Sequence, residues 1–336
     1  MSLGVTRLEE PHGLAPAYPS AEMIGSAAGD KASGENFPVA LRMLPGRYRR
    51  HLEAVYGFAR AVDDMGDEAP RDERVRLLDE LEADLGRLYR LTDRQPPGSQ
   101  PGQVQSAGSQ AAAARPADGR PAGGQPAAGD GSPRIGVIRA LAPVVAECAI
   151  PQQLFRDLIM ANRQDQVVTR YRTYQELLSY CELSANPVGR IVLRVFGAVT
   201  PAREVLSDKV CTALQLAEHW QDVAEDFQAG RIYLPGEDLA RFGVTEDDLS
   251  ASQASPQFRE LMAFEVQRAR RLLDEGAPLV GNLRGAARVA VAGYVAGGRA
   301  ALAAIAAAGH DVLRATPRPR RSRLVGEVLR AYATGR

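Results

Sequence analysis

Apolar residues recur at intervals of three and four along most of the chain. The clearest run is in residues 72–91, where the apolar positions are Val75, Leu78, Leu81, Leu85 and Leu88. This spacing is typical of amphipathic helices. It also predicts helices over 47–61, 135–148, 151–164, 173–197, 202–229, 256–275 and 281–308, with the first continuing into an acidic cluster. No segment alternates as a strand would, so the sequence predicts an all-α fold.

Two stretches have no such periodicity. Residues 1–30 are rich in Gly, Ala, Pro and Ser, and residues 95–133 consist almost wholly of Pro, Gly, Ala, Gln and Ser. Neither can bury enough apolar surface to offset the entropy of ordering it, so both are predicted to be disordered. The simplest organisation is one helical domain over 31–311, interrupted by 95–133 as a surface insert; a functional lid is the less favoured alternative.

The remaining residues, 312–336, form a basic tail. Its segment from Arg314 to Arg323 combines arginines with two prolines and is predicted to be solvated. Attraction to an anionic membrane surface is the alternative, since each such charge contributes about 1 kcal/mol near a leaflet. The longest apolar run, Val289 to Ala308, is broken by Arg299 and glycines. The N-terminus has no basic-then-apolar signal pattern. A cytoplasmic protein is expected, with peripheral contact at the inner membrane left open.

Overall charge and the metal-binding residue types exclude several classes of function. Lysine plus arginine and aspartate plus glutamate both total 41, so no net field attracts nucleic acid. The three cysteines are odd in number and widely spaced, which is typical of core thiols in a reducing compartment. The four histidines have no zinc-ligand spacing. Chemistry is therefore expected from carboxylates.

The first carboxylate cluster ends the predicted helix over 47–61. Asp63 and Asp67 are four residues apart and share a helical face, and Arg60 lies within reach of Asp63 and Asp64. Like charges at this spacing destabilise a helix, and a cation with oxygen ligands would remove that cost. Mg²⁺ suits the cluster because it binds one or two carboxylates together with water and phosphate oxygens.

A second cluster repeats the arrangement 150 residues later. Glu218, Asp222 and Asp226 are each four apart, and Arg231 and Tyr233 follow a turn at Gly230. Both clusters lie on helices whose other faces are apolar, so a bundle would point them into one cavity. A lone acidic pair is usually a solvated helix face, but two such clusters with basic neighbours favour metal binding. A di-iron carboxylate site uses Glu-x-x-His pairs, and neither cluster contains one.

Four segments carry a family resemblance. They are ENFPVALRMLPGRYRRHLEAVYGFARAVDDMGDE from Glu35, DQVVTRY from Asp165, YCELSANPVGR from Tyr180 and LQLAEHWQDVAEDFQAGRIYLP from Leu214. Their order and spacing resemble the squalene/phytoene synthase family. The ENFPVA and SANPVGR segments are similar to its hopanoid-pathway branch, which includes the enzyme that converts presqualene diphosphate into hydroxysqualene. Phytoene synthases more often have an Ala-Gly-x-Val-Gly sequence at 185–189.

The resemblance implies a single-domain isoprenoid-synthase helical bundle with a central cavity. It implies two or three Mg²⁺ ions, with Asp63, Asp64 and Asp67 as the first diphosphate motif and Asp222 and Asp226 as the second, joined by Glu218 as a metal ligand. The diphosphate would be surrounded by Asn36, Tyr56, Arg60, Gln215, Arg231 and Tyr233, with Tyr294 and Asp165 as further candidates. Apolar walls are expected from Phe37, Ala185, Val188 and Gly189.

The second motif departs from the family pattern at two positions. Glu218 stands where Asn is usual, and Gln221 stands where Arg often precedes the motif's first Asp. Glu218 can bind Mg²⁺ but adds a negative charge beside the diphosphate, so a catalytically silent prenyl-diphosphate-binding scaffold is one alternative. A head-to-head synthase making presqualene diphosphate, squalene or phytoene is the other.

The favoured function is conversion of presqualene diphosphate to hydroxysqualene and diphosphate. NADPH is not expected, because no Gly-x-Gly-x-x-Gly opens a strand–helix unit. Partners would be the isoprenoid diphosphate and other enzymes of the same pathway.

Overall fold

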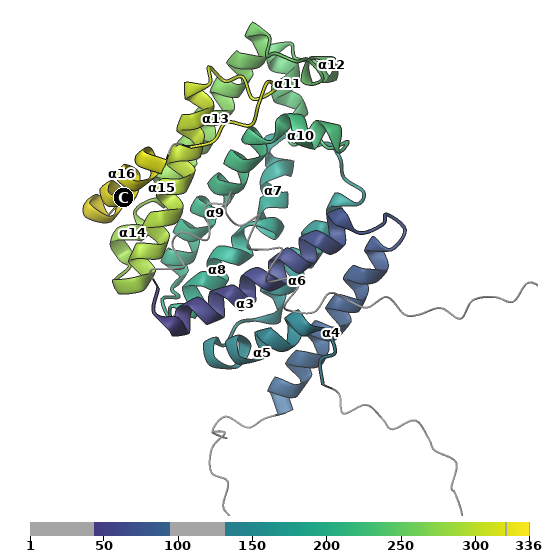
Figure 1. The fold of residues 1–336 in the computed structure, drawn as a ribbon, viewed down its shortest axis with the longest axis vertical. Helices are drawn as coiled ribbons and strands as arrows, with labels where there is room; N and C mark the ends of the chain where they lie inside the picture. Colours follow the sequence, from purple (N-terminus) through teal and green to yellow (C-terminus); the bar gives the residue numbers. More distant parts are fainter. Residues whose placement is uncertain (1–43, 95–131, 320, 336) are drawn as a thin grey trace, which may run out of the picture.

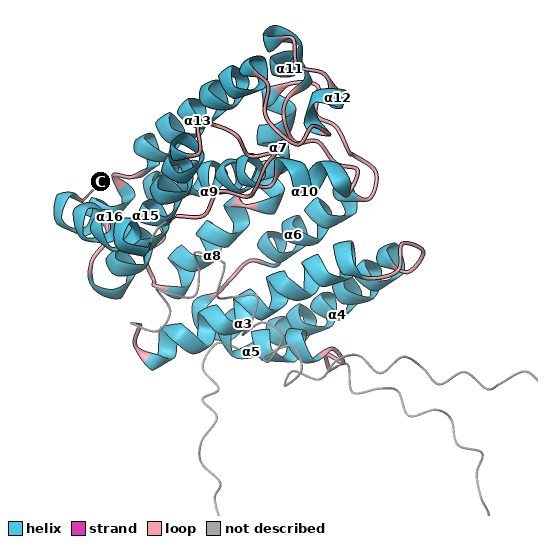
Figure 2. Ribbon diagram, turned by 45° about the horizontal axis from the view of Figure 1, so that its top comes forward, coloured by secondary structure: helices cyan, strands magenta, loops and turns pink. Residues whose placement is uncertain are grey.

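The computed structural model describes residues 44–94, 132–319 and 321–335. The predictions for the N-terminal segment and the insert, and those for Asn36 and Phe37, lie outside these residues. The described residues form helices joined by loops and contain no strand, as predicted (Figures 1 and 2). Its elements are α3 (Gly46–Asp63), η1 (Asp64–Glu68), α4 (Arg74–Arg94), α5 (Gly136–Cys148), α6 (Gln152–Asp165), α7 (Tyr174–Ser184), α8 (Asn186–Val195), α9 (Pro201–Gln221), α10 (Val223–Gln228), α11 (Gly236–Phe242), α12 (Glu246–Leu249), α13 (Pro256–Gly276), α14 (Leu279–Asn282), α15 (Gly285–Ala307) and α16 (Arg321–Thr334).

Local sequence signals set several of these boundaries. Thr173, Thr200 and Ser255 each begin a helix by accepting a hydrogen bond from the backbone N–H three residues on. The predicted helix over 173–197 divides at Ala185, because Pro187 lacks an N–H and cannot continue the ladder of α7. The predicted helix over 202–229 divides at Asp222, whose φ of −104° and ψ of 17° bend the chain between α9 and α10. Neither proline nor glycine marks this second bend.

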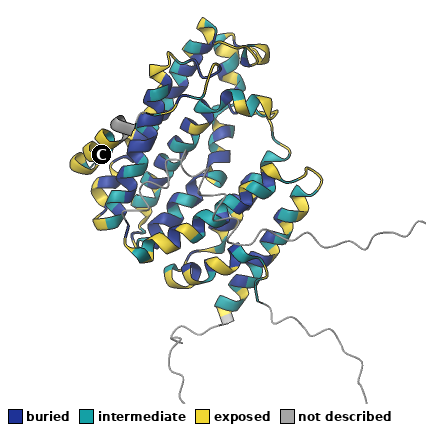
Figure 3. Ribbon diagram, in the orientation of Figure 1, coloured by how far each residue is buried: buried dark blue, intermediate teal, exposed yellow. Residues whose placement is uncertain are grey.

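The helices pack around two apolar cores. One joins α3, α4, α5, α6 and α8, with Phe58 and Phe155 in edge-to-face contact at its centre. The other surrounds α9, which packs against α13, α8 and α15 and buries Trp220 completely. Figure 3 shows buried residues lining the inward faces of the helices. Each large apolar side chain buried in this way contributes about 1.5–3 kcal/mol, so the two cores hold the helices that carry the acidic clusters in place.

Helix α15 is the one described helix that is long and apolar enough to cross a membrane. Two-thirds of its most apolar window, 67%, is buried inside the protein. Its small residues let neighbouring helices approach closely: a Cβ at Gly298 would meet Leu214 Cδ2 at 2.7 Å and Leu273 Cδ2 at 2.9 Å. Its apolar character is therefore accounted for by packing at the centre of the second core.

The C-terminal segment predicted to be solvated is mostly exposed where it is described: Arg314, Ala315 and Arg318 are exposed, and of residues 314–319 Pro317 alone is buried. Val312, Leu313 and Pro317 are buried, and α16 packs along α15 and α14 (Figure 1). Ala331 of α16 has no exposed surface, whereas Val325, Leu329 and Tyr332 stay exposed. Contact with a membrane stays a prediction.

Candidate active site

The first acidic cluster lies on a widened helical turn. Helix α3 ends at Asp63 and continues as the π-helical turn η1, in which the Ala69 N–H donates to the Asp64 carbonyl at 3.0 Å. Such turns inside helices often occur at functional sites. Here the turn places Asp63 and Asp67 on the wall of one polar pocket.

Helix α6 supports this turn through two amide side chains. Asn162 Nδ2 donates to Asp63 Oδ1 at 3.2 Å, and Gln166 Nε2 donates to the Gly66 carbonyl at 2.9 Å. The approach is so close that a Cβ at Gly66 would stand 2.2 Å from Asn162 Oδ1. The sequence prediction missed Asn162 and Gln166; the glycine inside an acidic helical cluster was the available signal of a close neighbour.

The second acidic cluster faces the same pocket from the α9–α10 bend. Glu218 lies on the last turn of α9, Asp222 at the bend and Asp226 on α10, and all three line the polar pocket with Asp63 and Asp67. The tertiary structure thus brings together two clusters separated by about 150 residues in sequence.

Most of the predicted site residues line this polar pocket. They are Arg60, Asp63, Asp67, Asp165, Val188, Gln215, Glu218, Asp222, Asp226, Arg231 and Tyr233. Three other predicted residues line neither this pocket nor the apolar pocket described below. Asp64 is held by Arg60 at 2.7 Å and Tyr56 is half-buried on α3, and neither lines the pocket. Ala185 is buried at the α7–α8 junction and does not line the apolar pocket, so its place beside a substrate stays a prediction.

Asp165 organises the floor of the pocket. Tyr180 Oη donates to Asp165 Oδ2 at 2.7 Å and Tyr233 Oη donates to Asp165 Oδ1 at 3.3 Å. The His219 ring stacks on Tyr233 with ring centroids 3.8 Å apart. Burial, helped by Arg231, lowers the pKa of His219 to about 3, so this imidazole is neutral at physiological pH. The roles of Tyr180 and His219 were not predicted, because they depend on contacts between distant segments.

Burial raises the pKa of the pocket carboxyl groups. It raises the pKa of Asp63, Asp165 and Asp222 to about 6 and that of Asp226 to about 7. Asp63 keeps exposed surface because it faces the pocket, while protein surrounds its other sides. Neighbouring carboxylates raise these pKa values further. The clustered negative charge is therefore unfavourable unless protons or a cation offset it.

Arginines offset part of this charge. Arg231 joins the two clusters, because its Nη1 and Nη2 donate to Asp67 Oδ1 and Oδ2 at 2.6 and 3.2 Å. Its Nε is buried and has no hydrogen-bond acceptor among the described residues; the same is true of the Ser184 hydroxyl, which also borders the pocket. Buried donors of this kind are normally satisfied. An anionic ligand with several oxygens would supply the missing acceptors.

The donor set suits Mg²⁺ in particular. Within residues 44–94, 132–319 and 321–335, no three His, Cys, Asp or Glu side chains converge closely enough to hold an ion by themselves. Mg²⁺ does not need such a cage, since it is commonly held by one or two carboxylates with water and substrate phosphates. Asp63 and Asp67 on one side, and Glu218, Asp222 and Asp226 on the other, would hold such ions.

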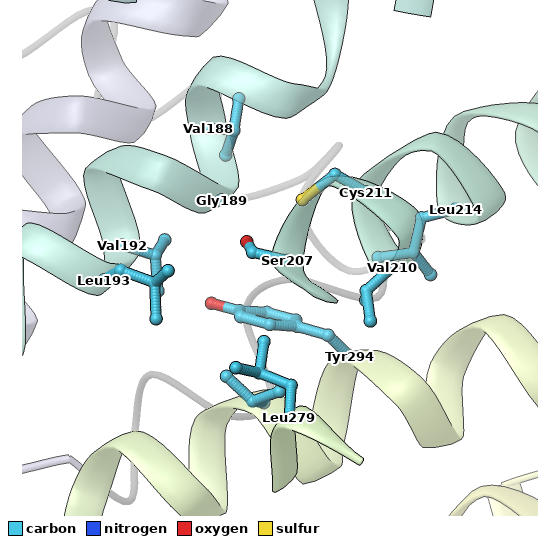
Figure 4. A pocket seen from close by; sticks show the side chains of 11 residues that line it. Val188, Gly189, Val192, Leu193, Ser207, Val210, Cys211, Leu214, Leu279 and Tyr294 are labelled. Atoms are coloured by element: carbon cyan, nitrogen blue, oxygen red, sulfur yellow. The ribbon is translucent and has the colours of Figure 1, made fainter. Parts of the chain in front are cut away.

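An apolar pocket adjoins the polar one, and Val188 lines both. It lies between α8, α9 and α15 and includes the predicted residues Gly189 and Tyr294 (Figure 4). A Cβ at Gly189 would stand 2.4 Å from both Cys211 Sγ and Ser207 Oγ, so this glycine sets the α8–α9 distance. Figure 4 shows the Tyr294 ring crossing the pocket with its hydroxyl toward Val192 and Leu193.

Together, the fold and the site define a helical enzyme for substrates with an anionic head and an apolar tail. The squalene/phytoene synthase family model matches residues 30–324. Hydroxysqualene synthase of Rhodopseudomonas palustris is 31% identical over 254 residues, covering 74% of this chain and 72% of that protein. The crystal structure of squalene synthase HpnC from Alicyclobacillus acidocaldarius is 35% identical, with a TM-score of 0.67, covering 85% of this chain and 94% of the other. A dehydrosqualene synthase solved with a ligand, 24% identical with a TM-score of 0.71, shares the fold over 93% of this chain and 94% of its own.

The chain therefore belongs to the squalene/phytoene synthase family, whose members act on isoprenoid diphosphates.

Proposed function

We propose that this protein is a Mg²⁺-dependent enzyme that ionises presqualene diphosphate and captures the carbocation with water, giving hydroxysqualene and diphosphate. The observation that carries the proposal is the junction of the two pockets at Val188, with six carboxylates lining one and aliphatic side chains lining the other. Similarity to hydroxysqualene synthases supports this choice of reaction within the family.

The chemistry begins with loss of the diphosphate. The carbon–oxygen bond breaks and the bonding electrons leave with the diphosphate, whose growing negative charge must be neutralised. Bound Mg²⁺ would supply Lewis-acid stabilisation of that charge. From the chain itself, Arg60 and Arg231 border the pocket and offer guanidinium groups, and the Arg231 Nε and Ser184 hydroxyl offer buried donors to the phosphate oxygens.

The apolar pocket protects the carbocation that remains. Val188, Val192, Leu214 and Leu279 hold the hydrocarbon and exclude water except where the polar pocket meets it. After rearrangement of the cyclopropane, a water oxygen bonds to the cationic carbon and loses a proton, which the released diphosphate can accept. Atoms and charge balance without NADPH.

Product analysis tests the proposal directly. Purified protein is incubated with presqualene diphosphate and Mg²⁺ in the absence of NADPH, and the extract is analysed by mass spectrometry. Hydroxysqualene is expected, with its hydroxyl oxygen labelled in ¹⁸O-water. If hydroxysqualene is absent and farnesyl or geranylgeranyl diphosphate gives presqualene diphosphate or phytoene instead, the protein is a head-to-head synthase.

The non-catalytic scaffold is the second candidate, and the observation that favours it is Glu218 on the pocket wall. The variants Asp63→Asn and Asp222→Asn separate the two hypotheses. In an enzyme each substitution should lower kcat by roughly a hundredfold or more, while leaving the protein folded. A wild-type protein that binds presqualene diphosphate without converting it would establish the scaffold.

A further inference from the structure

A segment far along the chain returns to the second acidic cluster. Residues 311–319, here called the C-terminal strap, leave the end of α15 and run beside α10 (Figure 1). Their first part is firmly anchored: Val312 is almost fully buried, and Asp311 Oδ2 accepts a hydrogen bond from Arg259 Nη2 at 2.7 Å. The path of the strap is therefore set by the core.

The strap is then tied to residues on both sides of Asp222. Gln221 Nε2 donates to the Pro317 carbonyl, and Thr316 Oγ1 donates to Glu225 Oε1 at 2.9 Å. Pro317 itself is buried. The next residue along the strap is Arg318, so its backbone is held beside the α9–α10 bend that presents Asp222 to the polar pocket.

The chain around Asp222 carries a concentration of negative charge that no nearby basic residue of the same segment offsets. From Glu218 to Gln228 the chain has four acidic residues and no lysine or arginine. Arg231, which follows, is already paired with Asp67. Gln221, which stands where the family often has arginine, carries no charge and instead holds the strap.

The side chain of Arg318 meets this need. It is exposed. Its backbone directly follows Pro317, whose carbonyl is held by Gln221, the residue before Asp222. An exposed arginine on a fixed backbone can move its guanidinium onto a ligand held at Asp222, and guanidinium groups bind phosphate oxygens in a bidentate manner.

We propose that Arg318 is a diphosphate-binding residue, delivered to the second acidic cluster by the C-terminal strap. This rests on the proposed function, because it assumes that the polar pocket holds the substrate's diphosphate. Arg318 would contact the leaving group from the side of Asp222, opposite Arg60 on α3. The strap contacts at Gln221 and Thr316 would act as positioning interactions.

The test is the affinity for inorganic diphosphate in saturating Mg²⁺, measured by calorimetry on the full chain. Arg318→Gln should weaken binding roughly tenfold or more, the range expected for losing hydrogen bonds to a charged group. Arg318→Lys should recover part of the loss. Arg314→Gln is the matched control, since Arg314 is exposed on the same strap and precedes its contacts with Gln221 and Glu225; its affinity should equal that of wild type. Thermal unfolding of each variant checks that the fold is retained.

The outcomes separate this inference from the proposed function. If Arg318→Gln binds diphosphate within twofold of wild type while Asp222→Asn does not bind, Arg318 is not a ligand and the proposed function stands. Arg318 is also not a diphosphate ligand if Arg318→Gln changes nothing except to tighten the binding of Mg²⁺ alone. That result would mean that the arginine charge only weakens the attraction between Asp222 and the metal. If wild type itself fails to bind diphosphate and shows no turnover, the proposed function is wrong.

Thr316→Val tests the positioning role. It removes the hydrogen bond to Glu225 without substituting Arg318 itself. A smaller loss of diphosphate affinity than in Arg318→Gln, without a change in thermal stability, is expected. An affinity equal to wild type would show that the strap does not depend on this contact.

Discussion

At the scale of single residues, the ionised carboxylates of the polar pocket lower the stability of the unliganded fold. Asp226 is the clearest case, because burial and neighbouring carboxylates raise its pKa to about 7 although Arg231 opposes them. An acid whose pKa is higher in the folded than in the unfolded state stabilises the fold at low pH. That contribution is lost as the pH rises through the folded-state pKa. The unliganded site is therefore least stable above pH 7, where its chemistry requires ionised carboxylates.

Asp226→Asn should raise the free energy of unfolding at pH 8 by about 1–3 kcal/mol, because it removes an ionised carboxylate from a crowded, partly buried site. It should also flatten the dependence of stability on pH between the ordinary pKa of an aspartate and about 7, and abolish turnover. Denaturant unfolding at several pH values, without added metal, measures this. Glu246→Gln is a control outside the pocket. Equal free energies of unfolding for wild type and Asp226→Asn at pH 8 would show that the ionised Asp226 carboxylate does not destabilise the fold.

At the scale of elements, close helix contacts hold the acidic motifs in register. Gly66 in η1 lets α6 approach until Asn162 and Gln166 bond to the turn. Gly189 in α8 likewise lets α9 approach closely, with Ser207 and Cys211 occupying the space that a Cβ would fill. In both places a missing Cβ sets the distance between two helices, and that distance sets the position of a pocket wall.

Gly66→Ala should therefore destabilise the protein by about 1–3 kcal/mol, the usual cost of overpacking. It should also lower kcat, since Asn162 must move away from Asp63. The matched control is Gly57→Ala on α3, where a Cβ would meet nothing within 4 Å and helix propensity should be slightly improved. Thermal unfolding and turnover are measured for both. If Gly66→Ala behaves like Gly57→Ala, η1 and α6 are not tightly coupled.

At the scale of the whole molecule, the site depends on contacts between segments that are far apart in the chain. The Arg231–Asp67 pair links residues 164 positions apart, and the C-terminal strap reaches Gln221 from 96 positions away. The polar pocket is therefore a property of the assembled bundle, and a ligand bridging its two walls should stabilise the whole domain.

Mg²⁺ and inorganic diphosphate together should raise the unfolding temperature at pH 8, and less so at pH 6, where protonation of the pocket carboxyl groups competes with the metal. At a hundredfold excess over Kd the stabilisation should be about 2.7 kcal/mol. Differential scanning fluorimetry with Asp63→Asn as control checks this. A shift equal in size at both pH values would mean that the pocket carboxylates do not bind the ion.

Features that depend on local spacing could be predicted from the order of residues. The period of apolar residues gives the helices, and the four-residue spacing of the aspartates gives two acidic faces, because both follow from helix geometry alone. The bend at Asp222 was not predicted, since no local residue type marks it. The C-terminal helix was also missed, because composition alone does not show whether its apolar face finds a partner.

Which helix faces meet depends on the packing of the whole bundle. It placed Glu218, Asp222 and Asp226 opposite Asp63 and Asp67, moved Ala185 and Tyr56 off the pocket walls, and brought the C-terminal strap to Asp222. The physical reason is that these contacts join segments far apart in sequence. Their geometry is set by how all the helices fill a common core, which no local pattern of residues contains.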